Sequence, residues 1–223
     1  MQKYFCAIML AIMLISATAC DYMSENDIVQ AGDKIHFGNS SWLVLEIYDD
    51  NTALIIAENI MGRSAFHSIG ESTTWETSDL RAYLNGEFLF EFTQDERARI
   101  LQREIHTPNN AWYGTRGGDD TTDYIFLLSV EEVVRYFGDS GQLENPSPPQ
   151  YGIRQWLLSD QYNSTRVAVD KDNMANGWWL RTSGFDYDFV VLVMSDGSIR
   201  IDGGNMALED GGIRPALLVN FAD

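Results

Sequence analysis

A cluster of oxygen-bearing side chains near the middle of the chain is the first group with a recognisable chemistry. Asp119, Asp120 and Asp123 follow a pair of glycines and are interleaved with two threonines. Calcium is a hard cation that prefers oxygen ligands, so these aspartates are candidate ligands for one calcium ion. Their spacing does not match an EF-hand loop. The alternative interpretation is a solvated turn whose aspartates accept hydrogen bonds from neighbouring backbone amides.

Two aromatic and two acidic residues alternate in a second segment, directly after Gly184. This group consists of Phe185, Asp186, Tyr187 and Asp188. The hairpin predicted after it adds Arg200, Asp202, Asn205 and Met206. Together these eight residues are candidate ligand-binding positions. Phe185 and Tyr187 favour this interpretation, because aromatic side chains offer a large contact area with little loss of rotamer entropy. An ordinary solvated loop is the alternative.

A predicted strand with two adjacent tryptophans is the third candidate. Trp178 and Trp179 could form a stacking platform for a sugar, but side chains alternate across a strand, so at most one would face outward. We therefore interpret both as structural core residues. Arg181 and Arg214 carry forks of donors that suit buried carboxylates or loop carbonyls, and we interpret them as structural too.

The sequence lacks the familiar arrangements for catalysis. His36, His67 and His106 are far apart, and none has a second histidine at ligand spacing on a helix. The pattern Gly-x-Ser-x-Gly of a nucleophile elbow is absent. With 33 acidic residues in the chain, no single pair of carboxylates points to glycoside hydrolysis.

The N-terminus has the pattern of a secretory signal. A basic residue precedes an apolar run over residues 5–15, which is too short to span a bilayer stably, and small residues then lead to Cys20. This ending resembles a lipobox, so we expect removal of residues 1–19 and a lipid anchor on Cys20 that holds the protein at a membrane. Ala17 stands where lipoboxes usually carry leucine, and ordinary signal-peptide cleavage near Ala19 is the alternative.

The mature chain would have the size of one domain and a strongly acidic charge. We expect an acidic tether over residues 20–31 and a single domain over 32–223. Lys3 is the only charged residue removed, so the net charge changes from −18 to −19. Such a surface repels phosphate backbones, which argues against a nucleic-acid partner.

Hydrophobic patterns and capping signals indicate both strands and helices. Capping boxes that begin at Thr93 and Ser129 predict two helices, the first running to about residue 104, and a capped start at residues 77–79 predicts another. Runs of β-branched and aromatic residues predict strands over 34–37, 42–48, 53–58, 124–128, 178–181, 189–194, 198–201 and 213–219.

Four longer motifs resemble an uncharacterised bacterial domain family. They are residues 75–88, residues 117–129, the Trp-Trp-Leu-Arg strand at 178–181 and the Gly-Ile-Arg-Pro-Ala-Leu ending at 212–217. That family is similar to the formylglycine-generating-enzyme branch of the C-type-lectin-like fold, which also contains the variable proteins of diversity-generating retroelements. The resemblance covers roughly residues 34–219 but is missing over 139–176, where we expect an insertion.

The resemblance implies an α+β domain of C-type-lectin-like (formylglycine-generating-enzyme-like) type, with twisted antiparallel strands and two or three flanking helices. It also implies a recognition surface around residues 185–206. Formylglycine-generating enzymes need two reactive cysteines, which a chain lipidated at Cys20 does not provide. We therefore expect an exported bacterial lipoprotein of the envelope or cell surface that acts as a non-catalytic binding or adhesion module for a glycan or a protein. A hydrolase of envelope polymers with an unrecognised site is the alternative.

Overall fold

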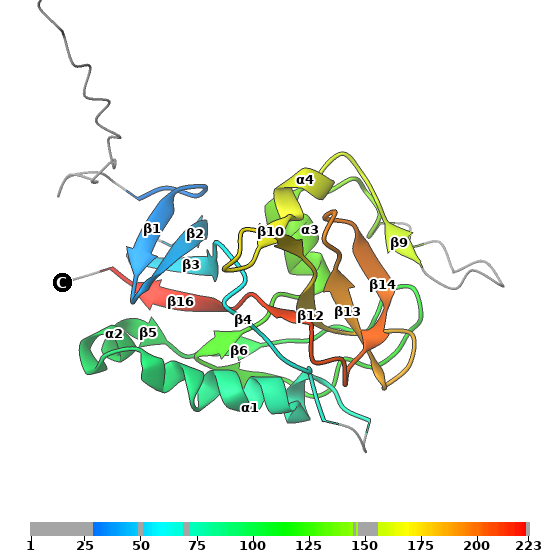
Figure 1. Ribbon diagram of the computed structural model, residues 1–223, viewed down its shortest axis with the longest axis horizontal. Coiled ribbons are helices and arrows are strands. Elements are labelled where there is room, and N and C mark those ends of the chain that lie inside the picture. The colour runs from blue at the N-terminus through cyan, green and yellow to red at the C-terminus, as the bar shows by residue number, and fades with distance from the viewer. Residues whose placement is uncertain (1–28, 49–50, 69–71, 145, 147–155, 222–223) are drawn as a thin grey trace, which may run out of the picture.

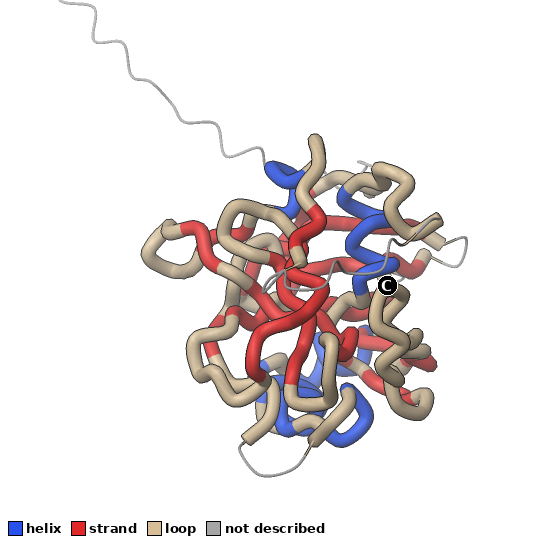
Figure 2. Tube along the Cα trace, turned by 90° about the vertical axis from the view of Figure 1, so that its right-hand side faces the viewer, coloured by secondary structure: helices blue, strands red, loops and turns tan. Residues whose placement is uncertain are grey.

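The computed structural model describes residues 29–48, 51–68, 72–144, 146 and 156–221. These residues form two mainly antiparallel sheets with short helices around them (Figure 1). This architecture confirms the expected mixed α+β class. In the view turned by 90°, strands cross the middle of the molecule and helices lie around them (Figure 2).

The first sheet has the order β1-β2-β3-β16-β5, and β8 also pairs with β16. Its strands are β1 (Lys34–Phe37), β2 (Ser40–Ile47), β3 (Thr52–Ala57), β5 (Ile100–Leu101), β8 (Ile125–Phe126) and β16 (Ala216–Asn220). Every residue of β3 is buried, because it lies between two strands and is covered on both faces. The predicted meander of three strands is confirmed.

The second sheet has the order β4-β15-β12-β13-β14-β9. Its strands are β4 (Gly62–Arg63), β9 (Leu157–Leu158), β12 (Trp178–Ser183), β13 (Phe189–Val193), β14 (Ile199–Asn205) and β15 (Gly212–Ile213). The β12–β15 pair is parallel and the other pairs are antiparallel. Two small hairpins complete the strands: β6 (Arg103–Ile105) with β7 (Thr121–Asp123), and β10 (Ala168–Val169) with β11 (Ala175–Asn176).

The described helices are all short. They are η1 (Trp75–Thr77), α1 (Asp79–Asn85), η2 (Phe88–Glu91), α2 (Gln94–Arg99), α3 (Val130–Phe137) and α4 (Asn163–Arg166). Both predicted capping boxes are present, at Thr93 and Ser129. Helix α4 and the β10–β11 hairpin lie within the segment expected to be an insertion. Among the described residues, no helix is long and apolar enough to cross a membrane.

Three predicted elements are shorter than expected. The helix from Thr93 ends at Arg99 because Ile100 and Leu101 leave it to pair with β16. The predicted strand 213–219 is two strands, because Pro215 has no N–H to donate and the chain passes there from the second sheet to the first. Of residues 124–128, only Ile125 and Phe126 pair with β16.

Candidate functional site

The two adjacent tryptophans lie in the core, on the central strand β12. Both side chains are almost fully buried. The indole Nε1 of Trp178 donates to the carbonyl of Arg166 at 3.1 Å, and that of Trp179 donates to the carbonyl of Ser64 at 2.9 Å. Neither ring is therefore available to stack on a ligand.

The two arginines of the family-like motifs, Arg181 and Arg214, are buried and connect different segments by hydrogen bonds. Arg181 donates to the carbonyls of Leu127 at 2.7 Å and His106 at 2.9 Å, and it pairs with the carboxylate of Glu132. Arg214 donates to the carbonyl of Ala57 at 2.9 Å. These contacts connect distant segments of the chain to β12 and to the link between β15 and β16.

The guanidinium of Arg214 is also enclosed by aromatic rings. It lies 4.9 Å from the ring centroid of Trp178 and 5.2 Å from that of Phe137. Burial lowers the pKa of Arg214 to about 10, partly offset by the negative charge of Glu58. The side chain therefore remains cationic at neutral pH, in a position where cation–π contacts and carbonyls replace water.

The structure separates the three aspartates that the sequence grouped as calcium ligands. Asp123 is buried and accepts hydrogen bonds from Trp75 Nε1 at 2.8 Å, from Arg81 Nε at 2.7 Å and from Thr121 Oγ1 at 2.7 Å. It lies on β7, where the alternation of side chains turns it inward. Its carboxylate is thus engaged with three donors of the protein itself.

The other two aspartates of this group are exposed and point to separate partners. Asp120 Oδ1 lies 2.7 Å from His106 Nδ1, whereas Asp119 Oδ1 lies 3.7 Å from Arg116. The predicted single cluster of oxygens is therefore not formed. Over the described ranges, no group of three or more His, Cys, Asp or Glu side chains is placed to hold a metal ion.

The loop between β12 and β13 holds the aromatic and acidic segment at the surface. Phe185 is 45% exposed, although its ring lies 4.4 Å from that of Phe189 and 6.2 Å from that of Tyr113. Tyr187 is 40% exposed. Asp188 Oδ1 accepts a hydrogen bond from Ser72 Oγ at 3.1 Å. The loop thus presents two exposed aromatic side chains, of which Phe185 packs against neighbouring rings.

A glycine allows this loop to pack closely against β14. A Cβ atom on Gly184 would lie 2.5 Å from the carbonyl oxygen of Asp202, a distance that real Cβ atoms do not reach. The amide of Phe185 donates to that same carbonyl at 3.0 Å. Only glycine therefore fits at the start of the loop.

The four candidate residues of the following hairpin do not share one surface. Asn205 is exposed, but Met206 is buried in the core. Asp202 is also buried; it pairs with Arg200 at 3.3 Å and accepts the amide of Trp156 at 3.1 Å. The expectation that all four decorate the surface is wrong, because Met206 packs in the core and Asp202 is covered by its contacts with Arg200 and the Trp156 amide.

A polar pocket of about 390 Å³ lies beside the aromatic loop. It is lined by Thr74, Glu76, Arg116, Gly118, Asp119 and Tyr187. The pocket joins two groups that the sequence treated separately, since Asp119 comes from the acidic segment and Tyr187 from the aromatic one. We call the surface formed by the loop 184–188 and the segments 72–76 and 113–119 the loop face.

Hydrogen bonds between backbone and side-chain groups hold the walls of this pocket together. The amide of Asp119 donates to Glu76 Oε2 at 3.0 Å, and Ser183 Oγ donates to the carbonyl of Arg116 at 3.0 Å. Gly118 has a φ of +95°, and a Cβ atom there would lie 2.4 Å from Thr74 Oγ1. A glycine is therefore required where the two walls meet.

Sequence reasoning missed the residue that connects the loop face to the second sheet. The side-chain amide of Asn110 donates to the carbonyls of Ser183 at 2.9 Å and Ile201 at 3.0 Å, and its oxygen accepts the amide of Trp112 at 3.0 Å. The pair of asparagines after Pro108 is a turn signal that could have drawn attention to this position.

Tyr113, which also was not predicted, packs against Phe185, with their ring centroids 6.2 Å apart. Burial raises the pKa of the Tyr113 phenol, and the negative charge of Asp202 raises it further. The phenol therefore stays neutral at physiological pH. Arg116 and Glu76 gave no signal in the sequence, because only the fold brings them beside Tyr187.

A second pocket lies on another part of the surface. It has a volume of about 470 Å³ and is lined by Ile60, Met61, Gly62, Arg63, Asp170, Lys171 and Asp172. Arg63 and Asp170 form an ion pair at its edge. None of the residues predicted from the sequence lines it, and it contains no aromatic side chain.

Comparisons with known proteins identify the domain family. No curated protein matches the chain, and no solved structure matches it. The family model described as Domain of unknown function (DUF6273) matches residues 50–221. The match includes both sheets except β1 and β2, together with the residues that form the loop face. Because the matched segment covers most of the 223 residues, the chain belongs to the DUF6273 family.

Proposed function

We propose that this protein is an exported bacterial lipoprotein whose loop face binds a ligand without catalysis. The observation that carries the proposal is the exposure of Phe185 and Tyr187 beside a polar pocket. Aromatic side chains fixed by their neighbours are favoured in binding surfaces, because little rotamer entropy is lost when they are covered.

We also propose that the fold is C-type-lectin-like, of the formylglycine-generating-enzyme type. The mixed α+β architecture, the mainly antiparallel sheets and the long irregular segments between β6 and β7 support this assignment. A crystal structure of the protein would test it by superposition on members of that fold class. A best match to an unrelated α+β fold would reject the assignment.

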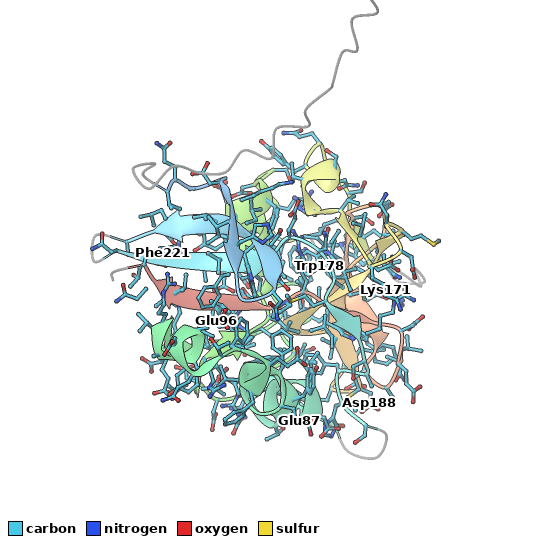
Figure 3. The ribbon with its side chains drawn as sticks, turned by 60° about the vertical axis from the view of Figure 1, so that its left-hand side comes forward. Glu87, Glu96, Lys171, Trp178, Asp188 and Phe221 are labelled. Carbon is cyan, nitrogen blue, oxygen red and sulfur yellow. The ribbon has the colours of Figure 1, made fainter. Side chains whose placement is uncertain are left out.

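The lipid anchor would be attached to the segment that precedes β1. Cys20 lies outside the described residues, which begin at Val29, shortly before β1. Asp188 of the loop face lies at the lower end of the domain in Figure 3, away from β1. We propose that an anchor on Cys20, which precedes β1 in the chain, leaves the loop face accessible to a ligand.

A substitution of the anchoring cysteine tests the localisation. Cys20→Ala is expected to move the protein from the detergent phase to the aqueous phase after phase separation of bacterial membranes, because no acyl chain can be attached. Cys6→Ala is the matched control, since this cysteine lies in the segment expected to be removed. Unchanged partitioning of the Cys20→Ala protein would contradict the lipid anchor.

A pull-down and a glycan array test the binding role. The full-length protein, kept in a detergent without sugar groups, is screened against envelope proteins and glycans. Phe185→Ala and Tyr187→Ala are expected to weaken binding by about 1 kcal/mol or more each, as truncation of aromatic anchors does. Phe90→Ala is the control, because Phe90 is an exposed aromatic residue outside the loop face. Full binding by both loop variants would place the site elsewhere, and turnover of an envelope polymer would overturn the non-catalytic assignment.

A further inference from the structure

We propose that the pocket beside Tyr187 binds a neutral saccharide ring. This inference rests on the proposed binding role of the loop face and adds the chemical class of the ligand. The volume of this pocket, about 390 Å³, lies within the range of sites for small ligands. Ligand pockets of that size are mostly apolar, whereas five of the six residues that line this one are polar, charged or glycine. A ligand with many polar groups is therefore expected.

The charges in the wall favour a neutral ligand over an ion. Glu76 and Asp119 contribute two carboxylates, which accept hydrogen bonds. Arg116 contributes a guanidinium, which only donates. Within the described part of the chain its one ion pair is the 3.7 Å contact with Asp119, and its side chain is mostly exposed. An anion would be repelled by the two carboxylates. A cation would have to compete with Arg116 for Asp119 and with the Asp119 amide for Glu76.

Hydroxyl groups can form hydrogen bonds with both the carboxylates and the guanidinium in the pocket wall. A hydroxyl donates one hydrogen bond and accepts others, so a ring with several hydroxyls can donate to Glu76 and Asp119 while it accepts from Arg116. Hydrogen bonds to ionised groups are stronger than those between neutral groups. A neutral polyhydroxylated ring therefore satisfies the wall without introducing a charge that must be desolvated.

Tyr187 supplies the remaining part of a saccharide site. Its ring is the one aromatic surface among the residues that line the pocket, and it is 40% exposed. The C–H groups on one face of a sugar ring are apolar and can cover an aromatic face, while the hydroxyls at the rim reach the polar wall. The tyrosine thus gives the ligand an orientation as well as buried area.

The same lining disfavours a protein partner in this pocket. Hot spots of protein interfaces lie in well-packed and fully desolvated pockets, whereas the Arg116 and Asp119 side chains of this lining are mostly exposed. Here Phe185, the exposed large apolar side chain nearest in sequence to the lining residues, is not part of the lining. A protein ligand would contact Phe185 from outside the pocket.

The test is calorimetry and a glycan array with the full-length protein in a detergent that contains no sugar. The probes are neutral oligosaccharides of glucose and of N-acetylglucosamine, with uronic-acid oligomers for comparison. We expect a neutral oligosaccharide to bind, Tyr187→Ala to weaken it about tenfold or more, and Tyr187→Phe to change it less than about threefold. Glu76→Gln and Arg116→Gln should each weaken it several-fold, whereas Lys171→Ala, in the second pocket, should have no effect.

The salt dependence of binding and the kind of ligand that binds show whether the inference is correct. Binding of a neutral sugar should change little between about 0.05 and 0.5 M salt, since screening acts on pairs of charges. Binding only of uronic-acid oligomers, strong salt dependence, or full affinity of Tyr187→Ala would overturn the inference. Capture of an envelope protein through Phe185 without binding of any neutral glycan would also overturn it and leave the proposed function standing. Failure of both assays would reject both.

Discussion

Strand β12 and the loop that follows it carry similar residues in opposite environments. Trp178 and Trp179 are almost fully buried, whereas Phe185 and Tyr187 are 45% and 40% exposed. The strand is hydrogen-bonded on both sides, and each indole N–H has a carbonyl partner. The loop backbone is held by hydrogen bonds to Asn110 and to β14, and the side chains of Phe185 and Tyr187 stay partly exposed. The residue type alone therefore does not tell whether an aromatic side chain is buried or exposed. Its position, in a central strand or in a loop, determines this.

The largest expected effect is on stability, from the strand. Trp178→Ala should lower the free energy of unfolding by about 3–5 kcal/mol, because it leaves a cavity and removes the ring beneath Arg214. Phe185→Ala should lower it by less than about 1 kcal/mol, because the ring is partly exposed. Urea titrations measure both values. The contrast between strand and loop would fail if the two substitutions destabilised the protein equally.

The second expected effect distinguishes two aspartates of the acidic segment. Asp123→Ala should cost about 3 kcal/mol, since Arg81 and Trp75 would lose the partner that faces them in the interior. Asp119→Ala should change stability by about 0.5 kcal/mol or less, because this side chain is exposed. Thermal and urea unfolding of both variants make the comparison. A large effect of Asp119→Ala would mean that the loop face also supports the fold.

A smaller effect on stability should depend on pH, through the ion pair of Asp160 with Arg166. Burial alone would raise the pKa of Asp160, but hydrogen bonds from Arg166, from Ser140 and from the amide of Tyr162 outweigh burial and hold the pKa below its ordinary value. A carboxyl group whose pKa is lowered by folding stabilises the protein above its unfolded pKa, which is about 3.9, and this stabilisation is lost as the pH falls through the folded pKa.

Asp160→Asn tests this pH dependence. The variant should be less stable than the wild type by about 2 kcal/mol at about pH 7, where the charged hydrogen bonds are present. The difference should shrink steadily below about pH 4. Urea unfolding at several pH values measures it. A difference that stays constant down to about pH 2 would show that the charge of Asp160 is not the cause.

The smallest expected effect concerns calcium. Asp119, Asp120 and Asp123 have separate partners, so millimolar calcium should leave the melting temperature unchanged relative to a chelator. Differential scanning calorimetry provides the measurement. An upward shift that disappears in Asp119→Ala would restore a calcium site to the loop face.

Local signals in the sequence determined several elements correctly. The capping boxes at Thr93 and Ser129 place helix starts, because their hydrogen bonds are made between residues three apart in the chain. The strands of the first meander follow from apolar runs between turn residues. Such features depend on neighbours in the sequence, which is the information that a single sequence contains.

Only the tertiary structure decided where the helix from Thr93 ends and where the candidate pocket lies. Ile100 leaves the helix because β16, from the far end of the chain, offers strand pairing. Glu76, Arg116 and Tyr187 meet because Gly118 and Asn110 bring their segments together. Met206 is buried and Tyr187 exposed for the same reason, since burial depends on which distant segment covers a residue. Long-range packing thus fixed the site, while local hydrogen bonding and hydrophobic patterns had already specified most of the elements that carry it.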